Sequence, residues 1–78
     1  MRVQNINGTA KRLPAGYSSW IQFWEAKTGE RAAAGRVGGH VKKTNSTDNA
    51  WYIAAITSTQ NSSSVPYEYT GRLAKLHD

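Results

Sequence analysis

The chain has 78 residues, enough for one small domain, and its lack of cysteine excludes disulfide bonds and cysteine-bound zinc. Ten lysine and arginine residues against five aspartate and glutamate residues give a net charge of +5, which favours acidic partners, with nucleic acid first among them. No apolar run is long enough to span a bilayer and no signal segment opens the chain, so we expect a soluble, cytoplasmic protein that does not contact membranes.

Residues 1–17 are predicted to form a mostly irregular N-terminal arm, because they contain two glycines and a proline and show little hydrophobic periodicity. Val3 and Ile6 are the apolar residues of this arm that could pack on the body of the protein. Residues 18–78 are predicted to form a single small domain.

A helix is predicted over residues 18–28. Ser19 can cap its first turn, and Gln22 follows three residues later, which is the spacing of a capping box. Gly29 is well placed to adopt the left-handed conformation that ends many helices.

Three aromatic residues of this helix recur at helical spacing, at Trp20, Phe23 and Trp24. Together with Trp51 they are expected to supply much of the core, since each aromatic side chain buries on the order of 200 Å². We therefore interpret them as core residues rather than as a platform on which bases stack.

The middle of the chain is typical of a β-hairpin. A strand is expected over 37–43, polar turn residues over 44–50, and an aromatic and β-branched strand over 51–56. The polar stretch 57–64 could form a short capped helix or only a loop, and residues 67–70 alternate like an exposed strand. These elements predict an α+β fold in which the helix packs on the hairpin, followed by the short helix or loop.

Residues that could carry catalysis are few. The only histidines are His40 and His77, and a metal site needs three or four converging ligands. Asp48 and His40 flank one hairpin turn, but no third ligand is evident. No serine lies in the sequence context of an activated nucleophile. We expect no metal, no cofactor and no small-molecule substrate.

A basic segment lies in the middle of the chain, where no acidic residue occurs between Arg31 and Thr47. Its side chains could contact phosphates or an acidic protein surface, and two later cations could extend the patch. The candidate nucleic-acid or partner-binding residues are Arg31, Arg36, His40, Lys42, Lys43, Arg72 and Lys75.

Three consecutive segments carry a resemblance to a known family: Val-Gly-Gly-His-Val-Lys-Lys at 37–43, Asn-Ala-Trp-Tyr-Ile-Ala-Ala-Ile at 49–56, and Thr-Ser-Thr-Gln-Asn at 57–61. The order resembles small bacterial and phage HNH-endonuclease-like proteins of the ββα-metal, treble-clef type. In that group a Gly-(Ala/Gly)-His-Val strand leads through a turn to a Trp-Tyr-Ile-(Val/Ala)-Pro strand and then to a Cys-x-x-(His/Cys)-Asn helix start. The similarity covers about residues 35–64, and the segment 20–29 also resembles the family's lead-in segment.

The chain departs from the family pattern at the metal ligands. Residues 31–35 read Arg-Ala-Ala-Ala-Gly where the family places a cysteine pair, and Thr57 and Gln60 replace the ligands before the asparagine. Of the family's functional positions, only His40, at the place of the general base, and Asn61 match. Without its ligands neither the structural zinc nor the catalytic metal can be held, so the resemblance implies a degenerate, cysteine-free ββα remnant that has lost nuclease activity.

These observations predict a non-catalytic small binding protein of phage or mobile-element type, located in the cytoplasm of a bacterial host cell. It would contact nucleic acid, or a complex that handles nucleic acid, through its basic face. The alternative is an anti-CRISPR-like inhibitor that binds a host defence protein complex. A residual HNH nuclease is the third hypothesis.

Overall fold

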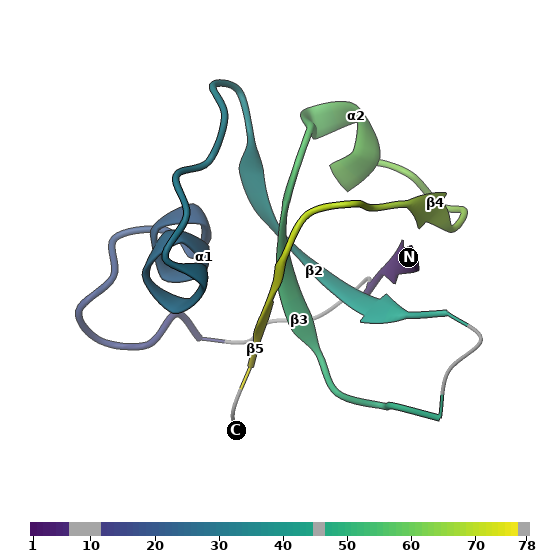
Figure 1. Ribbon diagram of the computed structural model, residues 1–78, viewed down its shortest axis with the longest axis horizontal. Helices are drawn as coiled ribbons and strands as arrows, with labels where there is room; N and C mark the ends of the chain where they lie inside the picture. Colours follow the sequence, from purple (N-terminus) through teal and green to yellow (C-terminus); the bar gives the residue numbers. More distant parts are fainter. Residues whose placement is uncertain (7–11, 45–46, 77–78) are drawn as a thin grey trace.

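An antiparallel hairpin formed by residues 37–43 and 52–56 lies at the centre of the molecule (Figure 1). The computed structural model describes residues 1–6, 12–44 and 47–76. In chain order its elements are β1 (Arg2–Asn5), α1 (Trp20–Thr28), β2 (Val37–Lys43), β3 (Tyr52–Ile56), α2 (Ser58–Asn61), β4 (Tyr67–Glu68) and β5 (Leu73–Lys75). The predicted α+β class is confirmed, and so are the predicted helix and hairpin.

The helix α1 is capped at both ends. The side chain of Ser19 accepts a hydrogen bond from the N–H of Gln22 at 3.3 Å, as predicted. The side chain of Gln22, however, accepts from the N–H and hydroxyl of Ser18 instead of returning to Ser19, so it reaches one residue further back than a capping box requires. Gly29 ends the helix with a φ of +74°.

The short helix α2 resolves the alternative that the sequence leaves open for residues 57–64. Thr57 and Gln60 form a reciprocal capping box, in which each side chain bonds the backbone of the other residue. Asn5 holds this helix against the sheet, because its amide nitrogen donates to the carbonyls of Gln60 at 2.7 Å and Ser63 at 3.0 Å. Caps and a single long-range anchor thus compensate for poor helix propensity.

The strands form one antiparallel sheet in the order β4-β1-β2-β3-β5. Part of the predicted irregular arm belongs to this sheet, since β1 pairs with β2 on one side and β4 on the other. Val3 is fully buried there. A four-residue strand with one fully buried side chain has too little periodicity to be recognised in the sequence. Residues 12–19 contain no helix or strand, and 7–11 lie outside the described residues.

The sheet curls so that its two edge strands approach each other. Tyr69, between β4 and β5, connects both sides of the curl. Its N–H donates to the carbonyl of Met1 at 2.8 Å, and its hydroxyl accepts from the N–H of Ala55 in β3 at 3.1 Å. The strand predicted over 67–70 therefore ends after Glu68, because Tyr69 turns into the interior.

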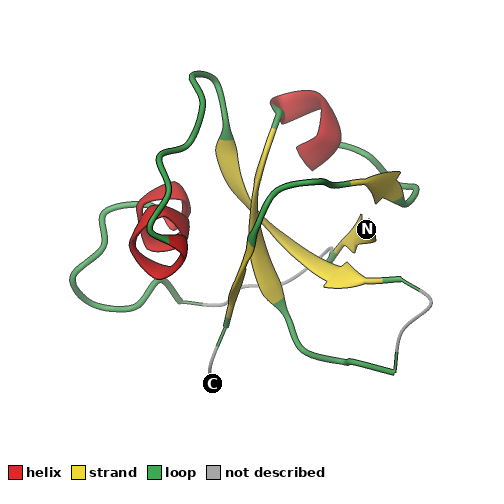
Figure 2. Ribbon diagram, viewed as in Figure 1, coloured by secondary structure: helices red, strands yellow, loops and turns green. Residues whose placement is uncertain are grey.

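Two hydrophobic clusters lie on opposite sides of the hairpin, and Figure 2 shows the two helices on its different sides. The buried residues inside the curl are Val3, Val41, Tyr52, Ala54, Ile56 and Tyr69. Those beneath α1 are Phe23, Trp24, Ile53 and Ala74.

The predicted core aromatics are distributed unevenly between these clusters. Phe23 and Trp24 are buried under α1, and half-buried Trp20 packs against them. Trp51 is half-buried and is not among the described residues of either cluster, so it is not one of the buried core residues that it was predicted to be. Val41 on β2 and Ile53, Ala54 and Ile56 on β3 are buried core residues instead.

Candidate nucleic-acid interface

His40 and Asn61, the two positions that match the family motif, lie on opposite faces of the sheet. The ring of His40 packs edge-on against Trp20 of α1, with ring centroids 4.6 Å apart. The side-chain oxygen of Asn61 lies 3.1 Å from where a Cβ on Gly39 would sit. Because neighbouring residues of a strand point to opposite faces, the structure does not bring His40 and Asn61 into one site.

Among the described residues, no group of three or more histidine or acidic side chains is placed to hold a metal ion. Asp48, in the loop between β2 and β3, accepts hydrogen bonds from the hydroxyl of Tyr52 and from the N–H of Ala50. These two bonds, the first most strongly, hold the pKa of Asp48 below its usual value, and the Tyr52 bond raises the pKa of that phenol. Asp48 therefore orders the turn as a carboxylate.

A cleft of about 380 Å³, here named the β1–β2 cleft, lies where these two strands meet the hairpin turn. It is lined by Arg2, Gln4, Lys42, Lys43, Thr44, Asp48, Asn49 and Pro66. Three of these side chains are cationic and one is anionic, so the cleft has a net positive charge.

Two of the cations in the β1–β2 cleft are available to a ligand. Arg2 and Lys42 are exposed, and neither forms an ion pair within the described part of the chain. Gln4 pairs with Lys42 in the sheet, which places Arg2 diagonally across from Lys42 on the same face. Such diagonal neighbours are about 7–8 Å apart. Glu68 is the register partner of Arg2 on β4, and its carboxylate forms an ion pair with the N-terminal ammonium at 2.7 Å.

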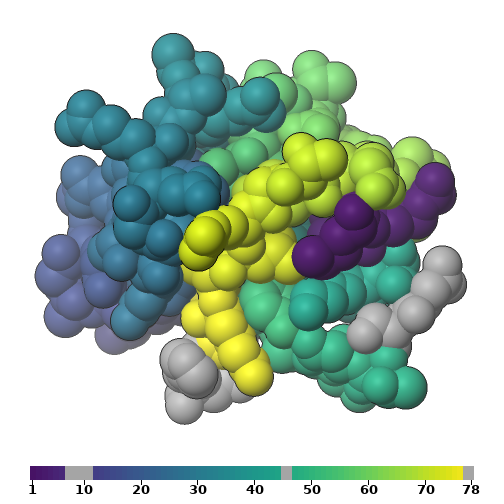
Figure 3. All heavy atoms as spheres, viewed as in Figure 1, coloured from purple at the N-terminus to yellow at the C-terminus, as the bar shows by residue number. Residues whose placement is uncertain are grey.

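A second cleft, of about 350 Å³, adjoins the first and is here named the β5 cleft. It is lined by Met1, Lys27, Thr28, Lys43, Tyr52, Gly71, Arg72 and Leu73. The described residues that line it include no carboxylate. Figure 3 shows the face where the purple N-terminal residues and the yellow C-terminal segment lie side by side, next to the teal and green residues of β2 and β3.

Lys43 lines both clefts and is the residue that joins them. Its ammonium group lies 4.9 Å from the centre of the Tyr52 ring and 3.5 Å from a carboxylate oxygen of Asp48. The side chain is 30% exposed. An ammonium held by one long ion pair and one ring face can turn toward a bound anion at little cost.

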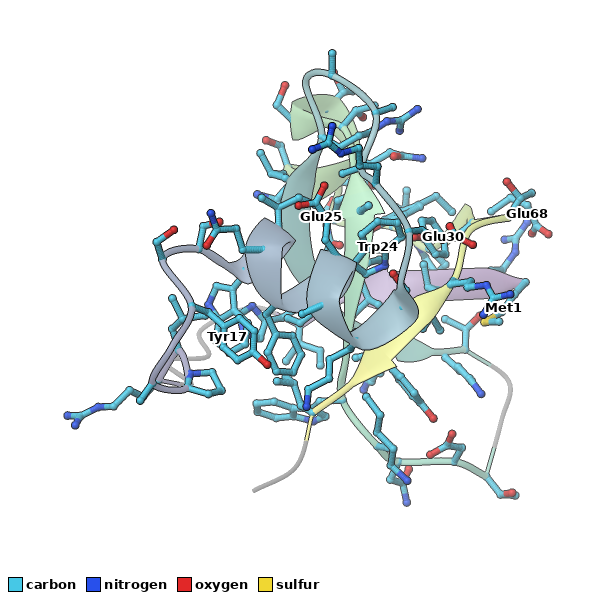
Figure 4. All side chains as sticks on the ribbon, turned by 60° about the vertical axis from the view of Figure 1, so that its left-hand side comes forward. Met1, Tyr17, Trp24, Glu25, Glu30 and Glu68 are labelled. Atoms are coloured by element: carbon cyan, nitrogen blue, oxygen red, sulfur yellow. The ribbon has the colours of Figure 1, made fainter. Side chains whose placement is uncertain are left out.

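A third cleft, of about 320 Å³, lies between the 30–36 loop and the 68–71 segment and is here named the acidic cleft. Its charged lining residues are Arg36, Glu30 and Glu68, and Figure 4 labels both glutamates together with Trp24, which also lines the cleft. Two carboxylates against one guanidinium disfavour a polyanion there.

The structure therefore divides the predicted binding residues. Lys42, Lys43 and Arg72 line the two basic clefts, although Arg72 also forms an ion pair with Glu30 at 2.8 Å. The other predicted residues lie elsewhere: His40 beneath α1, Arg36 in the acidic cleft, and Arg31 and Lys75 exposed outside all three clefts.

Arg2 and Lys27 are cleft residues that sequence reasoning missed. Arg2 lies in the segment predicted to be irregular, and the alternation of Arg2, Val3 and Gln4 around a buried valine is the one signal that could have revealed it. Lys27 lies on the predicted helix, but only the fold brings it near Lys43.

No protein-family model matches the chain, and no curated protein or solved structure is significantly similar to it. The site must therefore be interpreted from its own geometry. No helix of the described residues is long and apolar enough to cross a membrane.

Proposed function

We propose that this chain is a non-catalytic binding protein that contacts the phosphates of nucleic acid through the β1–β2 cleft. The observation that carries the proposal is the pair formed by Arg2 and Lys42, two exposed cations on one face of the sheet without an ion-pair partner in the described residues. Two cations on diagonally neighbouring positions of one sheet face can each contact a phosphate along one strand.

The polar residues around these cations support the same ligand. The side chains of Gln4, Thr44 and Asn49 line the cleft and can donate hydrogen bonds to phosphate or sugar oxygens. The single carboxylate of the cleft, on Asp48, is already engaged by a phenol and a backbone N–H. Contacts of this kind recognise the backbone, so binding is expected to depend weakly on sequence and steeply on salt.

The non-catalytic part of the proposal rests on the separation of His40 from Asn61. A general base needs its partner groups within hydrogen-bond reach of one reacting atom, and the sheet lies between these two side chains. Metal-dependent cleavage that His40→Ala abolishes would contradict this part of the proposal.

Two double charge reversals with the same change in net charge test the proposed site. Arg2→Glu with Lys42→Glu alters the cleft, whereas Arg31→Glu with Arg36→Glu alters exposed loop cations outside it. With a labelled 20-nucleotide probe at about 0.1 M salt, the first pair is expected to weaken binding at least about tenfold more than the second.

Circular dichroism and thermal unfolding would confirm that both double variants fold. Equal losses of affinity would mean that only net charge matters and would overturn the assignment to the β1–β2 cleft. If the wild-type protein bound no nucleic acid even at low salt, the proposal itself would be wrong, and capture of a host protein complex would become the next experiment.

A further inference from the structure

We propose that the β5 cleft receives an unpaired base of the same nucleic acid, so that the chain prefers a single strand to a duplex. This inference rests on the proposed function and extends it to the kind of nucleic acid that is bound. It is carried by the shape, charge and position of the β5 cleft.

The β5 cleft combines an apolar part with a cationic surround. Leu73 and the ring of Tyr52 contribute the apolar surface, while Lys27, Lys43 and Arg72 contribute the charge. At about 350 Å³ the cleft is at the lower end of the range of small-ligand sites, which runs from about 300 to 1,000 Å³. A flat aromatic group attached to an anion matches this combination, and a nucleotide is such a group.

The position of Lys43 connects the two clefts along the path of a strand. Lys43 lines both clefts, and its ammonium, which covers the ring of Tyr52, can turn toward a phosphate bound in the β1–β2 cleft. Tyr52 is 8% exposed, so this turn would uncover one face of a largely buried ring to the adjoining base. Stacking of a base on an aromatic side chain is worth about 1–3 kcal/mol and does not depend on sequence.

A duplex cannot use both clefts in this way. Its bases are stacked and paired inside the helix, and extracting one costs a few kcal/mol. The phosphates of a duplex can still reach Arg2 and Lys42, so duplex binding is expected to persist with lower affinity. The acidic cleft offers no alternative site, because Glu30 and Glu68 would repel the phosphate of an inserted nucleotide.

Three probes of equal length, about ten nucleotides, test the inference with the wild-type protein. The first is an oligothymidylate, the second is the same strand with its central bases removed to leave abasic sugars, and the third is a duplex. The oligothymidylate is expected to bind at least about fivefold more tightly than either of the others, since the stacking energy is lost in both.

A matched pair of variants tests whether the β5 cleft is the site that favours the single strand. Lys27→Ala removes an exposed cation that lines only the β5 cleft, whereas Lys75→Ala removes an exposed cation that lines none of the three clefts. Lys27→Ala is expected to weaken binding of the oligothymidylate about threefold and leave duplex binding unchanged, while Lys75→Ala changes neither.

The outcomes separate this inference from the proposed function. If the abasic strand or the duplex bound as tightly as the oligothymidylate, the proposal of base insertion would be wrong, while the proposal of phosphate binding would stand. If Lys27→Ala and Lys75→Ala behaved alike, the β5 cleft would not be the site. If none of the three probes bound, both proposals would fail.

Discussion

The hydroxyl of Tyr69 accepts a hydrogen bond from the backbone N–H of Ala55 at 3.1 Å and donates one to the carbonyl of Arg72 at 2.8 Å. A single side chain, 7% exposed, thus bonds the backbone of β3 and that of the residue before β5, the strand that pairs with β3. The β5 cleft lies next to this crossing, with Gly71 and Arg72 in its lining. The bond therefore holds the segment that shapes the proposed binding surface.

Tyr69→Phe is expected to lower the free energy of unfolding by about 2 kcal/mol, because it leaves the N–H of Ala55 without its partner and the carbonyl of Arg72 with only the indole N–H of Trp24. Tyr67→Phe is the matched control. Tyr67 is half-buried, and its hydroxyl donates one hydrogen bond, to the side chain of Asn5 at 2.6 Å. Its removal is therefore expected to lower the free energy of unfolding by about 1 kcal/mol. Urea unfolding measures both variants, and equal losses would mean that the hydroxyl of Tyr69 stabilises the fold no more than that of Tyr67.

Gly38→Ala is expected to destabilise the protein more than Gly39→Ala. A Cβ on Gly38 would lie 2.6 Å from the backbone carbonyl carbon of Trp20, so α1 would have to move as a unit. A Cβ on Gly39 would meet first the terminal methyl of Ile56, which can rotate. Chemical denaturation should show that the free energy of unfolding falls by about 3 kcal/mol in Gly38→Ala and by about 1–2 kcal/mol in Gly39→Ala. The reverse order would show that α1 packs loosely on β2.

Asp48 is expected to make the stability of the protein depend on pH in the acidic range. Its folded pKa lies below the ordinary value of 3.8, so the carboxylate stabilises the fold above that pH, and the contribution disappears as the pH falls through the folded pKa. The gap in urea midpoint between wild type and Asp48→Asn should therefore be largest above about pH 5 and shrink toward about pH 2. A gap that stayed constant with pH would mean that the ionised carboxylate contributes nothing.

The sequence predicts the elements whose patterns are local. The caps at Ser19 and Gly29, the aromatic spacing of α1 and the alternation around Val41 each lie within a few residues, and those elements match the structure closely. The strand β1 was missed because its stability comes from pairing with β2 and β4, and no local pattern reports a partner 36 or more residues away.

The binding residues were predicted less well than the fold, for a related reason. The basic segment was recognised by its charge, but strand alternation sends Lys42 and Lys43 to opposite faces, and His40 packs beneath α1. Charge along a sequence does not reveal which cations share a cleft, because Arg2 and Lys42 become neighbours only through the β1–β2 pairing.

A salt titration of binding to a labelled single strand is the decisive experiment, with magnesium present in half the samples and cleavage followed in all of them. Contacts from the cations of the two basic clefts, Arg2, Lys42, Lys43, Lys27 and Arg72, predict that log affinity falls with log salt with a slope of about −2 to −3.5. No cleavage is expected in either set. Binding that is insensitive to salt, no binding at low salt, or strand cleavage would each contradict a non-catalytic protein that holds nucleic acid by its phosphates.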